Sequence, residues 1–315
     1  MGWTRGGAEA ARAALVEVGV DAHTAARHVD DALAGWLRLG LLRLERPPPE
    51  TQATFFIDGA ACGFATPRKD HLDSIAQAFP VQARDSDSAA APFQLIDFGG
   101  SLHIFREGRH VGVCEPGEVA PTAKALAIGD ILARERADIL LHAACLSRNG
   151  RALLLNGAPG AGKTTLSLRL VDRKCGYCGD DIALIAPDGL VAGLPFPPTV
   201  KSGAWDMFPG LEGAAVHRRP DGQEVKYAAL DRVDHASHPV GWIVFLRRQA
   251  GAAPKLHPVD SVEALRRIIS GAHAPDRRLS LSGFDTLRRI LAEARTVELV
   301  YGCAAAALCD FCDGT

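Results

Sequence analysis

The chain has 315 residues, a formal net charge of −2 and 47% hydrophobic residues, values that are ordinary for a soluble globular protein. Its lysines and arginines are scattered, so it lacks the basic stripe that nucleic-acid binding needs. No apolar run reaches the roughly 18–20 residues that span a bilayer. Glu9 and Glu17 interrupt the first 20 residues, which argues against a signal peptide. We therefore expect a cytoplasmic protein with no nucleic-acid partner and no membrane association.

A small helical module is predicted for residues 1–46. Asp21 can cap a helix over 23–39, whose apolar residues recur at helical spacing, and Gly40 ends that helix. A short strand is expected to begin in the leucine-rich segment 41–44. The run of three prolines that follows indicates a stiff linker and a domain boundary.

A β-rich region is predicted for residues 51–118. The segments 53–65 and 92–114 are rich in β-branched and aromatic residues, and glycines punctuate the second of them. This pattern is typical of a meander of hairpins. The polar, alanine-rich segment 81–91 is expected to be a mobile loop.

Residues 119–315 have the alternating pattern of an α/β domain. The elements expected in chain order are a helix over 119–136, a strand over 139–146 that contains His142, a hairpin turn at Asn149-Gly150, a strand over 152–155, a helix over 163–172, a strand near Tyr177, a strand over 182–185 leading to a turn at 187–189, a strand over 241–246, helices over 260–270 and 284–294, and a strand over 297–301.

A glycine-rich loop lies between the apolar strand 152–155 and the helix that starts at Lys163. Its sequence matches G-x-x-x-x-G-K-[ST], in which the backbone N–H groups and the helix N-terminus hold phosphate. In such a loop Lys163 reaches the β- and γ-phosphates, and the hydroxyl of Thr164 holds Mg²⁺. The predicted nucleotide-binding residues are Gly157, Ala158, Pro159, Gly160, Ala161, Gly162, Lys163, Thr164 and Thr165. ATP and Mg²⁺ are the expected cofactors.

Two adjacent aspartates, Asp180 and Asp181, follow Lys163 after about 17 residues, at the end of a predicted strand. Mg²⁺ takes a carboxylate ligand besides the hydroxyl and the phosphates. A second carboxylate can accept the proton of an attacking hydroxyl during phosphoryl transfer. An acidic turn on the surface is the simpler alternative.

Taken together, Leu141-His142-Ala143-Ala144, Asn149-Gly150, the loop and Gly179-Asp180-Asp181 resemble the HPr kinase/phosphorylase superfamily, and more closely its shorter relatives beside peptide-modification genes, such as lasso-peptide kinases. The resemblance covers about residues 95–301. It implies a P-loop kinase core of the HPr kinase C-terminal (PEP-carboxykinase-like) type within 119–315.

The resemblance also implies roles for the site residues. Asp180 would be the general base and Asp181 would help to hold the metal, although the two roles could be interchanged. His142 would lie near the phosphates or orient Asp180, unless it is only a packed strand residue. Lys201 and Lys226 match basic positions of the family loosely and would contact phosphate or substrate, or else be surface lysines. HPr kinases form hexamers, so a homo-oligomer is a possible state.

The chain departs from the longer family members in having no Glu-Ile-Arg-Gly signature after the aspartates. Phosphorylase activity and HPr as substrate are therefore not expected.

Residues 8–45 resemble the C-terminal half of PqqD-like peptide-recognition domains, which implies binding of a peptide. The alternative is a helical bundle that packs on the kinase region.

The leading prediction is an ATP/Mg²⁺-dependent kinase that phosphorylates a hydroxyl, such as serine, of a peptide or small protein. The alternatives are a nucleotide hydrolase or switch, and a non-catalytic nucleotide-binding regulatory module.

Eight cysteines include two C-x-x-C pairs, Cys175–Cys178 and Cys309–Cys312, about 130 residues apart. A zinc ribbon brings its two pairs within roughly 15–20 residues of each other. Free buried cysteines are therefore the simpler interpretation, with a shared zinc site as the alternative.

Overall fold

The computed structural model describes residues 5–43, 47–80, 92–98, 100–134, 137, 139–273 and 279–302. Helices and strands alternate along the chain and the strands form several sheets, in agreement with the predicted α/β class. The chain divides into two compact units: unit 1 comprises Met1–Ala127 and Val216–Glu224, and unit 2 comprises Ile128–Ala215 and Val225–Thr315. Within the described residues, no helix is long and apolar enough to cross a membrane.

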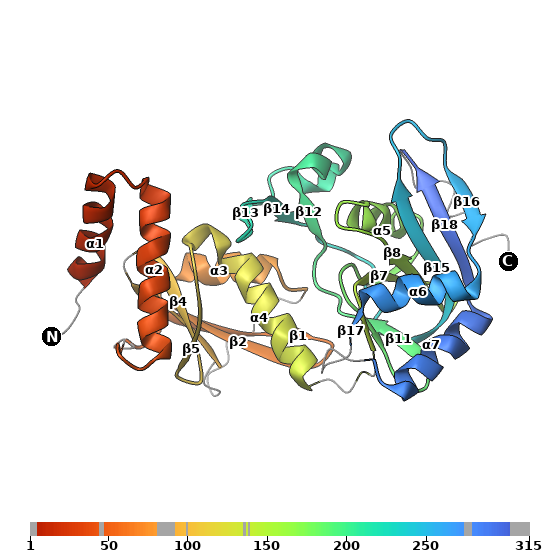
Figure 1. Ribbon diagram of the computed structural model, residues 1–315, viewed down its shortest axis with the longest axis horizontal. Coiled ribbons are helices and arrows are strands. Elements are labelled where there is room, and N and C mark those ends of the chain that lie inside the picture. Colours follow the sequence, from red (N-terminus) through yellow and green to blue (C-terminus); the bar gives the residue numbers. More distant parts are fainter. Residues whose placement is uncertain are drawn as a thin grey trace. The chain divides into compact units, whose positions relative to one another are not determined.

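Unit 1 begins with the antiparallel helices α1 (Arg5–Glu17) and α2 (Ala22–Arg38), drawn in red in Figure 1. The cap predicted for α2 is confirmed, because an Asp21 carboxylate oxygen accepts from the backbone N–H of Thr24 at 3.0 Å. The strand predicted after the helix is wrong for Leu41 and Leu42. Their N–H groups both bond back to the carbonyl of Trp36, at 2.9 and 3.2 Å, so this backbone closes the helix end instead. Leu44 lies outside the described residues.

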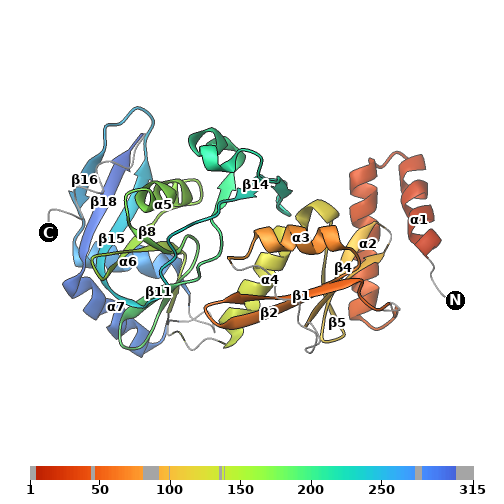
Figure 2. The same cartoon turned by 180° about the vertical axis from the view of Figure 1, so that it is seen from behind.

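Unit 1 also contains a five-stranded sheet with the order β1-β2-β3-β4-β5. Its strands are β1 (Thr51–Ile57), β2 (Ala60–Thr66), β3 (Phe93–Phe98), β4 (Ser101–Arg106) and β5 (Arg109–Cys114). The predicted hairpins are confirmed for β1–β2, β3–β4 and β4–β5. The pair β2–β3 is parallel, which requires a crossover. Helix α3 (Lys69–Gln77), which the sequence interpretation left unassigned, lies in this connection along β1 and β2 (Figure 2). The predicted loop 81–91 lies outside the described residues.

Unit 1 also contains the helical turn η1 (Pro116–Glu118) and the short strand β13 (His217–Arg218). The predicted helix over 119–136 is confirmed as α4 (Val119–Arg134), in which the division between the two units falls.

Ten strands among the described residues build the main sheet of unit 2, with the order β17-β6-β10-β11-β15-β8-β7-β9 and with β18 beside β15 and β16 beside β18. These strands are β6 (Ile139–Leu141), β7 (Ala143–Arg148), β8 (Arg151–Asn156), β9 (Gly176–Gly179), β10 (Ala183–Ile185), β11 (Leu190–Gly193), β15 (His238–Arg248), β16 (Lys255–Pro258), β17 (Ala272–His273) and β18 (Arg295–Tyr301). Strands β8, β15 and β18 run parallel, so their carboxyl ends meet at one edge.

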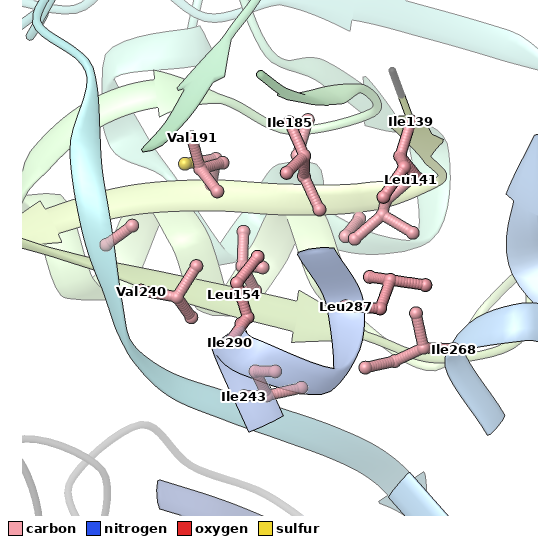
Figure 3. Packing of buried hydrophobic residues seen from close by; sticks show 14 of the residues in the cluster. Ile139, Leu141, Leu154, Ile185, Val191, Val240, Ile243, Ile268, Leu287 and Ile290 are labelled. Carbon is pink, nitrogen blue, oxygen red and sulfur yellow. The ribbon is translucent and has the colours of Figure 1, made fainter. Parts of the chain in front are cut away.

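Two layers of apolar side chains cover the faces of this sheet. On one face α6 (Ser261–Gly271) and α7 (Leu281–Glu293) pack on a cluster that contains Ile139, Ile243 and Ile290 (Figure 3). On the other face α5 (Lys163–Val171) packs on Leu153, Val244 and neighbouring residues. The short strands β12 (Thr199–Lys201) and β14 (Glu224–Tyr227) pair with each other, with the helical turns η2 (Ser202–Met207) and η3 (Pro209–Leu211) between them. This segment packs on α5 through Leu168.

The strand predicted over 139–146 is wrong as a single element, because the chain bends at His142. The part before the bend, β6, pairs with β10 and β17, whereas the part after it, β7, pairs with β8 and β9. The two halves therefore join different neighbours. His142 lies between them and is exposed.

Candidate phosphate-binding site

The glycine-rich loop leaves the carboxyl end of β8 and opens α5, as its motif predicts. Gly160 and Gly162 have φ values of 83° and 94°, a left-handed conformation that favours glycine. Gly157 is needed for close packing, since a Cβ there would lie 3.0 Å from that of Ala161 and 3.1 Å from that of Leu246. The glycines thus hold a compact turn at the positive end of the α5 dipole.

The other predicted loop residues follow the same turn with graded exposure. Ala158, Pro159 and Gly160 are exposed, whereas Thr164 and Thr165 are half-buried at the start of α5. The exposed part of the loop is therefore open to a ligand and its two ends are anchored in the domain.

Lys163 is the first residue of α5 and only 8% exposed. Its Nζ donates to the carbonyl of Gly157 at 2.7 Å. Burial lowers the pKa of Lys163, the carboxylates of Asp181 and Asp180 act in the opposite direction, and Lys201 adds to the lowering. A buried ammonium held by a carbonyl is incompletely compensated, and an anion in the loop would supply the missing charge.

Asp180 follows β9 directly and is only 2% exposed. The hydroxyl of Thr164 donates to its Oδ2 at 3.1 Å, which joins the loop to the aspartate pair. The hydroxyl of Tyr177 lies 3.1 Å from its Oδ1 and 2.9 Å from the carbonyl of Phe196. Burial, followed by the charge of Asp180, raises the pKa of Tyr177 well above its usual value, so this hydroxyl remains a donor.

Asp181 and His142 meet beside this arrangement. Asp181 is half-buried, and its backbone carbonyl lies 3.0 Å from Nδ1 of the exposed His142. A hydrogen bond to this carbonyl requires a proton on Nδ1, because a carbonyl oxygen can only accept. The structure thus brings His142 to the aspartate pair through the backbone of Asp181.

Two tyrosines of the site were missed by sequence reasoning. Tyr177 lies on the short strand before the aspartates, where an aromatic residue reads only as part of the core. Tyr301 lies at the end of β18 and its hydroxyl donates to the carbonyl of Ala161 inside the loop. A Cβ on Gly162 would lie 2.5 Å from this hydroxyl oxygen. No local motif marks a contact between residues 140 positions apart.

Lys201 and Lys226, which the sequence did not distinguish, have different surroundings in the structure. Lys226 donates to the carbonyl of Leu211 at 3.0 Å and lies 4.7 Å from the ring centroid of Trp205, so it holds the segment over α5 in place. Lys201 is exposed, and its charge acts on Lys163.

The first C-x-x-C pair does not form a joint site. Cys175 and Cys178 are both buried, but they belong to the apolar clusters on opposite faces of the sheet. A hydrogen bond with Cys178, together with burial, raises the pKa of Cys145 well above its usual value. Across the described residues, no group of three or more His, Cys, Asp and Glu side chains could hold a metal. Cys309 and Cys312 lie outside the described residues.

The donor set around the loop nevertheless fits Mg²⁺ bound together with a phosphate chain. The Thr164 hydroxyl and the Asp180 carboxylate are hard oxygen donors within hydrogen-bonding distance of each other. Mg²⁺ is commonly held by one or two protein oxygens, with phosphate and water completing its shell. Thr164 and Asp180 could provide this protein share.

No protein-family model matches the chain, and no curated protein matches it. Among solved structures, the HPr(Ser) kinase/phosphatase from Coxiella burnetii resembles part of the chain, with 12% sequence identity and a TM-score of 0.25. The likeness covers 54% of this chain and 89% of that protein. A likeness this weak carries no weight for function, which has to be judged from the residues of the site.

Proposed function

We propose that unit 2 is a P-loop kinase domain of the HPr kinase C-terminal type, which uses ATP and Mg²⁺ to phosphorylate a hydroxyl, such as serine, of a peptide or small protein. The main support is the 3.1 Å hydrogen bond between Thr164 and Asp180, because it joins the phosphate loop to the aspartate pair. Lys163 is the first residue of the same helix, and the charges of both carboxylates raise its pKa against the effect of burial. Phosphoryl transfer needs these parts together: a phosphate cradle, a cation and a carboxylate.

The resemblance first implied that Asp180 is the general base and that Asp181 helps to hold the metal. The surroundings of the two aspartates support exchanging these roles. Asp180 is buried, and both of its oxygens have hydroxyl partners. It is therefore suited to hold a metal with Thr164 and poorly placed to receive an acceptor hydroxyl. Asp181 is half-buried, so a substrate can reach it. We assign the general base to Asp181, with His142 fixing its backbone carbonyl.

Lys163 and the loop N–H groups would bind and orient the phosphate chain. When bound, Mg²⁺ supplies neutralisation of the charge on the phosphate oxygens. Asp181 would accept the proton of the attacking hydroxyl, whose oxygen forms the new bond to the γ-phosphorus as the bond to the leaving ADP oxygen breaks. Proton transfer of this kind contributes about 10²–10⁴-fold to rate.

The test is transfer of labelled γ-phosphate from ATP to a degenerate library of serine-containing peptides in the presence of Mg²⁺. We expect Asp181→Asn to lower transfer by about 10²–10⁴-fold while ATP binding persists. We expect Asp180→Asn to raise the Mg²⁺ concentration needed for half-maximal transfer. Asp188→Asn is the matched control, because Asp188 is exposed in a turn, where its side chain accepts from the N–H of Leu190.

Phosphate release to water at one rate with and without peptide, and without labelled peptide, would refute the kinase assignment. That result would instead identify a nucleotide hydrolase. ATP binding without any turnover would identify a regulatory module.

A further inference from the structure

A hollow of about 770 Å³ lies beside the phosphate loop, at the carboxyl ends of β15 and β18. Arg248, the segment 250–254 and Gly302 line it. In a parallel sheet the carboxyl ends share one edge, so the hollow opens at the edge from which the loop leaves β8.

Tyr301 links this hollow to the loop. Its hydroxyl donates to the carbonyl of Ala161 in the loop, while its own carbonyl accepts from the N–H of Gln249 at 2.8 Å. The next residue, Gly302, donates to the carbonyl of Ala252 at 2.9 Å. One side chain and its adjoining peptide therefore separate the loop from the rim of the hollow.

Arg248 lies on the same face of the sheet as the loop. Successive side chains of a strand alternate between faces, so Arg248 shares a face with Leu246. Leu246, Tyr301 and Ala161 belong to one apolar cluster. Burial raises the pKa of Tyr301 and the positive charge of Arg248 opposes this rise, as expected for a guanidinium near the hydroxyl.

We propose that this hollow binds the nucleoside of the nucleotide whose outer phosphates lie in the loop, with Arg248 facing the α-phosphate. This inference rests on the proposed function. The volume lies within the roughly 300–1,000 Å³ of small-molecule sites. Alanines and a proline supply an apolar shelf for a base, and none of the lining residues, all of them within the described ranges, is acidic. In ATP the nucleoside follows the α-phosphate. The N–H groups of the loop bind only phosphates, so the nucleoside needs a separate site.

The inference can be tested by comparing calorimetric affinities for Mg²⁺-ATP and for inorganic tripolyphosphate. Ala253 is exposed, so Ala253→Trp should fill the hollow without disturbing the core. We expect this variant to bind ATP about tenfold more weakly or worse, and tripolyphosphate within about twofold of the original chain. Ala250→Trp should do the same from another part of the rim, and Ala236→Trp, exposed in a different loop of unit 2, should change neither affinity.

Arg248→Gln should weaken both ligands alike, because both carry a phosphate at the α position. Its matched control is Arg247→Gln. Arg247 points to the opposite face and pairs with Glu298 at 3.1 Å, and Arg267 still pairs with Glu298 after the change. Arg247→Gln should therefore leave both affinities unchanged.

The outcomes separate the two proposals. If the original chain binds neither ATP nor tripolyphosphate, the proposed function fails. If it binds ATP, but both tryptophan variants bind ATP equally well, the nucleoside site is wrong. Equal affinity of the original chain for ATP and tripolyphosphate would also overturn it, since the nucleoside would then contribute nothing.

Discussion

Two buried charged groups, one in each unit, have contrasting partners. In unit 1 the carboxylate of Asp30 accepts from Arg12 at 2.6 Å and from Ser101 at 2.5 Å. In unit 2 the ammonium of Lys163 donates to the carbonyl of Gly157, and the charges of Asp181 and Asp180 act on it without a direct ion pair among the described residues. Both residues are 8% exposed. The first charge is compensated by the protein, which indicates a structural role, whereas the second is left for a ligand to compensate, which indicates a binding site.

The largest effect is expected from Lys163→Met. Removing the cation from the phosphate loop should lower phosphoryl transfer by about a thousandfold or more. The unfolding free energy should stay equal or rise, because burial disfavours this charge and, among the described residues, no carboxylate forms a direct ion pair with it. Enzyme assays and denaturant unfolding would check both parts, with Lys174→Met, at an exposed position, as control. A large loss of stability would place Lys163 with the structural charges.

Asp30→Ala should have the opposite outcome. It leaves Arg12 partly buried without its carboxylate, a loss that typically costs about 3–5 kcal/mol of stability. Nucleotide affinity of the folded protein should not change, because the site lies in unit 2. Denaturant unfolding would measure the first effect and calorimetry the second. Asp31→Ala, at the exposed neighbouring position, is the control. A stability equal to that of the control would show that the Asp30 pair contributes nothing to folding.

Acid should also lower the stability of the protein mainly through unit 1, where His103 is fully buried. Burial lowers the pKa of His103 from 6.5 to about 4, and the charge of His110 adds a smaller lowering. Asp30 raises this pKa in part, and Arg12 lowers it by less than Asp30 raises it. The unfolded chain then binds more protons between these values, so stability is lost as the pH falls from 6.5 towards 4, by up to about 3 kcal/mol.

This pH effect would be measured as the unfolding free energy of the original chain and of His103→Phe at several pH values. The difference isolates the histidine, because the two chains have every other titratable group in common. Parallel curves for the two proteins over this range would show that His103 does not drive the acid effect.

The sequence predicted well those features that a few neighbouring residues decide. Asn149 and Gly150 have φ values of 50° and 72°, the left-handed pair that their hairpin needs. The glycine loop and the cap at Asp21 are equally local. The break at His142 was not predictable, because it depends on which strands β6 and β7 join. The contact of Tyr301 with Ala161 depends on the order of strands in the sheet, which no local pattern encodes.

The smallest effect is expected from Tyr177→Phe. Tyr177 combines the two roles compared above, because it contributes both to the structure and to the site. The change leaves the buried carbonyl of Phe196 without this donor, at a cost of about 1–3 kcal/mol, so it acts on structure. It also releases Oδ1 of Asp180, so it acts on the site. We expect a severalfold shift in the Mg²⁺ concentration for half-maximal transfer, with the maximal rate within about tenfold of the original. Tyr227→Phe, at another buried tyrosine, should leave the Mg²⁺ dependence unchanged. If Tyr177→Phe loses stability with the same Mg²⁺ dependence, Tyr177 belongs with Arg12 and Ser101 as a structural partner, and Asp180 is positioned for the metal by Thr164 alone.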